Sequence, residues 1–124
     1  VPEPQWGTAD AVEIALRLTG SGSPIVAYRG FAGGQWMVSD EAGAPTHVVQ
    51  RAAEGVAYAA RTGDGEWTAE WLIPWKSLGL TGRERAKLPF NLTIRRPADG
   101  AWIMWQGTGS YSWQVNSAGF LQLP

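Results

Sequence analysis

Apolar and polar residues alternate with a period of two in most segments of this chain that lie between glycine or proline clusters. In residues 11–19, for example, Val12, Ile14 and Leu16 alternate with small or charged residues. A period of two is that of a β-strand. The pattern therefore predicts strands at residues 11–19, 25–31, 35–39, 46–51, 56–61, 67–73, 90–96, 101–106 and 120–123.

The segment 67–80 carries the most informative pattern, because an alternating strand runs directly into a proline. Pro74 has no amide hydrogen to donate to a sheet, and its fixed φ favours the start of a short helical turn. Gly79 is typical of the end of such a turn. The strand phase and the position after Pro74 predict that three tryptophans lie in the core: Trp67, Trp71 and Trp75.

Short strands with glycine and proline between them predict an all-β fold, an antiparallel β-sandwich of jelly-roll or immunoglobulin-like type. A barrel is the second choice. The only helical turn that we expect follows Pro74. The length of 124 residues is enough for a single hydrophobic core, so we predict one domain, residues 1–124.

Composition excludes several classes of function. The net charge is -1 and lysine and arginine do not cluster, which argues against nucleic acid or anionic membrane as a partner. The chain has no cysteine and a single histidine, His47, so thiolate and multi-histidine metal sites are excluded. No apolar run is long enough to span a bilayer. Eight tryptophans are unusual, and either a core or a ligand surface must use them.

Four short motifs occur in a characteristic order: DAVEI at residues 10–14, WTAEWLIPWKSLG at 67–79, FNLT at 90–93 and GFLQL at 119–123. This order resembles the family 9 carbohydrate-binding modules and their DOMON-like relatives. The resemblance implies non-catalytic binding of a polysaccharide or oligosaccharide. It also implies an extracellular, cell-surface or periplasmic location and linkage to a larger glycan-active protein.

Domains of the resembled type usually begin with a strand or two before the DAVEI strand, whereas only residues 1–10 precede it here. Three explanations stay open: the lead-in supplies a shortened edge, a segment has been lost, or a partner chain completes the sheet. An exposed sheet edge would favour a strand-mediated dimer.

Sugar binding requires flat aromatic rings, because the C–H faces of a pyranose are apolar. In the resembled family two such rings clamp the sugar. Trp6 and Trp113 lie outside the predicted strands and are the candidates for this clamp; the alternative is that each only covers the core or anchors a loop. Trp102 shares its strand face with Met104, which favours the core for that pair and leaves Trp105 as a surface or ligand-binding ring.

Hydrogen bonds to sugar hydroxyls require carboxylate, amide or guanidinium groups. Glu13 lies on the non-core face of its strand, and the resemblance places the matching residue beside the sugar. A solvent-exposed face explains such polar residues equally well. The polar candidates for ligand binding are Glu13, Arg29, Asn91 and Asn116.

Catalysis is a minority interpretation. A glycoside hydrolase needs two carboxylates across a cleft, and no acidic residue here lies in a motif that singles it out. No nucleophile elbow or phosphate-binding glycine loop is present. A ligand-free accessory or interaction domain is the remaining alternative.

We expect no cofactor, with structural calcium as the exception. Some DOMON-like domains bind haem through methionine and histidine, and the resemblance makes Met37, Met104 and His47 the residues to consider. Calcium would use loop carboxylates, although the spacing of Asp40, Glu41 and Asp64 matches no dedicated calcium loop.

Overall fold

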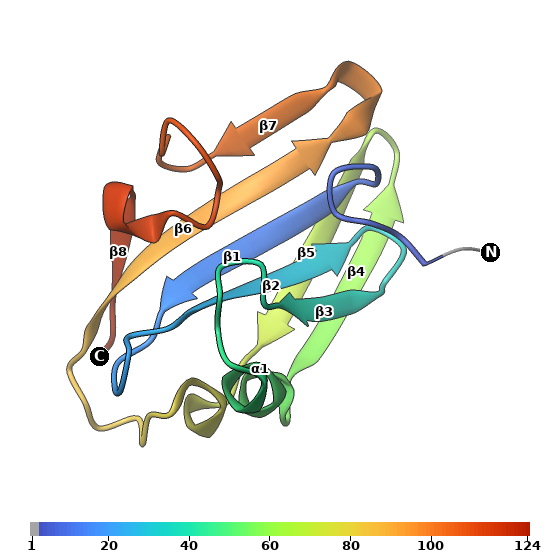
Figure 1. The fold of residues 1–124 in the computed structure, drawn as a ribbon. Helices are drawn as coiled ribbons and strands as arrows, with labels where there is room; N and C mark the ends of the chain where they lie inside the picture. Colours follow the sequence, from blue (N-terminus) through green and yellow to red (C-terminus); the bar gives the residue numbers. More distant parts are fainter. Residues whose placement is uncertain (1–2) are drawn as a thin grey trace.

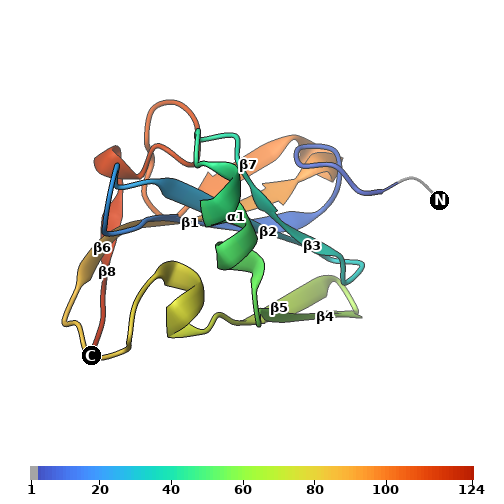
Figure 2. The ribbon, with the colours of Figure 1, turned by 60° about the horizontal axis from the view of Figure 1, so that its bottom comes forward.

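The computed structural model describes residues 3–124 and places the strands in two layers (Figure 1). Turning the molecule shows the larger layer above and a hairpin below (Figure 2). The elements are β1 (Ala11–Arg17), β2 (Ile25–Phe31), β3 (Trp36–Ser39), α1 (Thr46–Ala53), β4 (Ala57–Gly63), β5 (Glu66–Leu72), η1 (Trp75–Leu78), β6 (Lys87–Arg96), η2 (Pro97–Asp99), β7 (Ala101–Met104), η3 (Val115–Ser117) and β8 (Gly119–Gln122).

The large sheet has six strands in the order β3-β2-β1-β6-β7, with β8 pairing along another part of β6. The second sheet is the β4–β5 hairpin. Every strand pair is antiparallel, which confirms the predicted all-β antiparallel architecture. We call the face of the large sheet that points toward the hairpin the inner face, and the opposite face the outer face.

The inner face is joined to the hairpin at Gly30, where the absence of a side chain lets two rings reach the backbone. A Cβ atom at Gly30 would lie 2.3 Å from the Tyr58 ring and 2.7 Å from the Trp71 ring. The Tyr58 hydroxyl donates a hydrogen bond to the carbonyl of Phe31 at 2.8 Å. Trp71 also packs against the buried ring of Tyr28. This contact fixes the hairpin under β2.

One predicted strand is wrong: residues 46–51 belong to the helix α1. The run contains two adjacent valines, which favoured a strand. The structure instead buries Val48 and Ala52, which are four residues apart and share one helix face. The Tyr28 hydroxyl donates to the Ala52 carbonyl at 2.7 Å, and burial raises the pKa of Tyr28 well above its usual value. The turn after Pro74 is present as η1, and it lies beside α1 (Figure 1).

The hairpin is narrower than the large sheet and leaves part of the inner face uncovered. A groove of about 480 Å³ runs between β5 and β6. Its lining is Val12, Ile14, Trp67, Ala69, Trp71, Leu92 and Ile94. The core positions predicted for Trp67 and Trp75 are therefore wrong, since Trp67 is half-buried on this groove and Trp75 is 39% exposed. Trp71 packs against the core, as predicted.

None of the helices within residues 3–124 has the length and apolar character needed to cross a bilayer. In the same part of the chain β5 pairs only with β4, so its other edge is open. The strand-mediated dimer stays a prediction, and the solution mass from light scattering is the measurement that tests it.

Candidate functional site

Aromatic side chains gather in one open pocket on the outer face of the large sheet. Its volume is about 460 Å³. Two aromatic pairs contribute. The rings of Trp6 and Trp102 meet edge to face with their centres 5.3 Å apart, and those of Tyr111 and Trp113 stack in parallel with their centres 5.4 Å apart. We call this the aromatic pocket, and its complete lining is Trp6, Glu41, Trp102, Met104, Ser110, Tyr111, Ser112 and Trp113.

Trp6 reaches the pocket from a short arm before β1. Gly7 has a φ of 98°, a left-handed conformation that glycine adopts readily and that turns the chain directly after Trp6. The Arg95 guanidinium donates to the Gly7 carbonyl at 2.8 Å and stacks on the Trp102 ring at 4.3 Å. The guanidinium of Arg29 lies 4.6 Å from the centre of the Trp6 ring. Two cations thus hold the arm, and with it Trp6, against the sheet.

Trp113 reaches the same pocket from the loop between β7 and η3. Its ring packs against a small apolar cluster on the outer face, formed by Ala15, Ile25 and Val115. Tyr111 is 60% exposed and extends the aromatic surface toward solvent. This apolar packing therefore fixes the Trp113 ring, which also lines the pocket.

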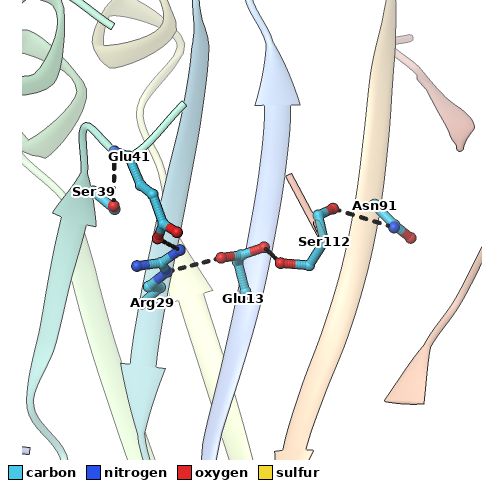
Figure 3. Close-up of polar contacts among 6 residues, drawn as sticks. All are labelled: Glu13, Arg29, Ser39, Glu41, Asn91 and Ser112. Atoms are coloured by element: carbon cyan, nitrogen blue, oxygen red, sulfur yellow. Dashed lines mark hydrogen bonds and ion pairs between the residues drawn. The ribbon is translucent and has the colours of Figure 1, made fainter. Parts of the chain in front are cut away.

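A chain of polar contacts runs across the sheet beneath the pocket (Figure 3). Arg29 on β2 donates from Nε to Glu13 on β1 at 2.8 Å and from Nη2 to Glu41 at 2.7 Å. The Ser112 hydroxyl donates to the other oxygen of Glu13 at 2.6 Å. We call Glu13, Arg29 and Glu41 the ion cluster. It ties the Ser112 loop to the two strands next to the pocket.

Asn91 on β6 fixes the other end of this loop (Figure 3). Its Nδ2 donates to the carbonyls of Gln106 at 3.0 Å and Ser112 at 3.4 Å. Its Oδ1 accepts from the amide of Gln106 at 3.1 Å. Because Asn91 is buried and its amide group is engaged on both atoms, its role is to position the loop that carries Trp113.

The structure brings together the two rings predicted as a clamp, since Trp6 and Trp113 line one pocket. Glu13 is only 1% exposed, so it does not lie on a solvent-exposed face; with Arg29 it forms the layer beneath the pocket. The side chain of Asn116 accepts a hydrogen bond from Arg17 at 2.8 Å and is not part of the pocket lining.

The core position predicted for Trp102 and Met104 is wrong, whereas Trp105 lies at the surface, which is one of the two positions predicted for it. Trp102 lines the pocket with Met104, whereas Trp105 lies on the inner face beside Phe90 and is 52% exposed. The prediction assumed that one face of this strand meets a core. On the inner face the hairpin does not cover this part of the sheet, since Ile103 and Trp105 are 46% and 52% exposed, and Trp102 on the outer face is 46% exposed.

Three further lining residues were not singled out by the sequence pattern: Ser110, Tyr111 and Ser112. All three lie in loops, where no strand period indicates the direction of a side chain. They are the three residues directly before Trp113, and this closeness was the only signal that could have found them.

The residues considered for haem do not converge. Met37 is exposed on β3 and Met104 lies on β7, at opposite edges of the large sheet. His47 is exposed on α1. Within residues 3–124, no three histidine or acidic side chains lie close enough together to hold a metal ion.

No protein-family model, curated protein or solved structure matches the chain.

Proposed function

We propose that this chain is a non-catalytic carbohydrate-binding domain and that the aromatic pocket is its binding site. The observation that carries the proposal is that Trp6 and Trp113, from opposite ends of the chain, line one pocket together with Trp102 and Tyr111. Flat rings supply the apolar contact that the C–H faces of a sugar need.

Rigid support strengthens the proposal. The rings are held by Arg29, Arg95 and the apolar cluster behind Trp113, so the pocket is formed before a ligand arrives. A preformed site loses little conformational entropy on binding. Stacking of a nucleic-acid base on an aromatic ring is worth roughly 1–3 kcal/mol, and sugar stacking of similar size predicts affinities from roughly micromolar to millimolar.

The carboxylates near the pocket favour binding over hydrolysis. A glycoside hydrolase needs two carboxyl groups that reach the glycosidic bond. Glu41 lines the pocket, but Glu13 lies beneath it, where Arg29 and Ser112 engage both of its oxygens. An extracellular or surface location, and linkage to a larger glycan-active protein, belong to the same proposal and rest on the resemblance to family 9 modules.

Replacing Trp113 tests the site. We expect Trp113→Ala to weaken glycan binding by roughly 5- to 150-fold, the ratio that corresponds to the loss of one stacked ring. Affinity electrophoresis of the unmodified chain on cellulose, xylan, mannan and pectin first identifies a retained glycan. Isothermal titration calorimetry with an oligosaccharide of that glycan then gives the affinity of the variant.

Trp105→Ala is the matched control, because it removes a tryptophan from the opposite face. It should leave the affinity within about twofold of the unmodified chain. Equal losses in the two variants, or retention of none of the glycans by the unmodified chain, would contradict the proposed site.

A further inference from the structure

Glu41 is the only charged residue in the lining of the aromatic pocket, counted over residues 3–124. Its side chain is 45% exposed. One carboxylate oxygen, Oε2, accepts from Nη2 of Arg29 at 2.7 Å, and no described residue donates to the other oxygen. Its backbone amide donates to the Ser39 hydroxyl at 3.1 Å, which holds the carboxylate at this position (Figure 3).

The ion cluster carries an excess of negative charge. Arg29 contributes +1 and the two carboxylates -2, which leaves -1 for the cluster. Glu13 is buried, so Glu41 is the member that presents this charge to the pocket. The neighbouring Arg95 keeps its positive charge, because its partners, the Trp102 ring and the carbonyls of Gly7 and Ala101, are neutral, but it is not part of the pocket lining.

Aromatic faces and a carboxylate favour the same kind of ligand group. The faces of aromatic rings attract cations, and since Arg29 and Arg95 already lie over Trp6 and Trp102, Tyr111 and Trp113 are the rings of this pocket with no described cation over them. A carboxylate forms its strongest hydrogen bonds with a charged donor. A sugar hydroxyl supplies a neutral donor, whereas a protonated amine supplies a charge as well. An uncharged glycan would therefore bind without the attraction between the Glu41 carboxylate and a positive charge on the ligand.

We propose that the aromatic pocket prefers glycans that carry protonated amino groups, of the β-1,4-linked glucosamine type, and that Glu41 determines this preference. The inference rests on the proposed carbohydrate function and adds the ligand class. The amine would donate to the free oxygen of Glu41 while the aromatic rings contact the sugar faces.

Three trisaccharides with the same β-1,4 backbone test this directly, because they differ only at C2: the glucosamine trimer, the N-acetylglucosamine trimer and cellotriose. We expect the glucosamine trimer to bind the unmodified chain roughly three- to tenfold more tightly than cellotriose at low salt. The N-acetylated trimer, which has no charge at C2, should not share this preference. Added salt should reduce the ratio, since a half-exposed ion pair is screened.

Glu41→Gln removes the charge and keeps an oxygen that Arg29 can contact. The glucosamine-to-cellotriose affinity ratio should fall to near one in this variant. Glu70→Gln, on the exposed face of β5, is the matched control and should keep the full ratio. Circular dichroism and the thermal midpoint verify that both variants are folded, and titration calorimetry gives the ratio within each of them.

Two outcomes would overturn the role of Glu41 while leaving the carbohydrate function intact. The first is equal affinity of the unmodified chain for all three trimers, and the second is an undiminished ratio in Glu41→Gln. Binding of choline chloride with no binding of any trimer would instead overturn the carbohydrate function itself, and the inference with it.

Discussion

Replacing Trp71 with alanine should lower the free energy of unfolding by about 3–5 kcal/mol, the usual loss for a large aromatic side chain removed from a core. The centre of the Trp71 ring lies 4.4 Å from the centre of the Tyr58 ring, 5.8 Å from that of Tyr28 and 6.0 Å from that of Trp36. The ring also covers the bare backbone of Gly30. Alanine removes these ring contacts and enlarges the groove between the layers, which Trp71 lines.

Chemical denaturation followed by circular dichroism measures this loss. Trp75→Ala is the control, since this tryptophan is 39% exposed and lies at the surface of η1. Its loss should be smaller, because a larger part of this residue is already exposed than of Trp71. Equal losses for the two variants would contradict the packing role of Trp71.

Replacing Glu13 with alanine should cost about 3–5 kcal/mol of folding stability, because it leaves the buried guanidinium of Arg29 without its buried partner. The Ser112 hydroxyl also loses its acceptor. Glu41 stays paired with Arg29, but it is half-exposed and compensates a buried charge poorly. The loop that carries Trp113 should loosen as well, so glycan affinity should fall together with stability.

Two comparisons separate the charge effect from simple loss of contacts. Glu41→Ala removes the exposed partner of the same guanidinium and should cost about 0–1 kcal/mol. The double variant Glu13→Leu with Arg29→Met replaces the buried pair by apolar side chains and should recover most of the stability lost by Glu13→Ala. A double variant no more stable than Glu13→Ala would show that charge burial is not the cause.

The strands that alternate strongly were predictable from the sequence alone. The period at residues 11–19 and 67–73 identifies β1 and β5 to within two residues at each end. The helical structure of residues 46–51 was not predictable, because a six-residue run with adjacent valines is compatible with a strand and with a helix. The contacts of Val48 and Ala52 with the core decide between them, and these are tertiary contacts.

The aromatic pocket was predictable only in part. Trp6 and Trp113 were identifiable because they lie outside the predicted strands, where no strand period assigns a tryptophan to the core. The burial of Glu13 was not predictable, because its partner Ser112 is 99 residues away in the sequence and lies in a loop. The wrong core prediction for Trp102 has another physical cause: a strand period assigns side chains to faces, but it does not say which face another layer covers.

The arm that carries Trp6 sets a thermodynamic limit on the pocket. It belongs to no strand, and within the part of the chain that the structure describes its hydrogen bonds are those of the Gln5–Thr8 turn, the bond from Arg95 to Gly7 and the bond from Ala32 to Asp10. The binding-competent pocket exists only while this arm is docked. The measured dissociation constant is therefore the intrinsic constant divided by the docked fraction. A substitution that strengthens docking of the arm would raise the affinity without contacting the ligand.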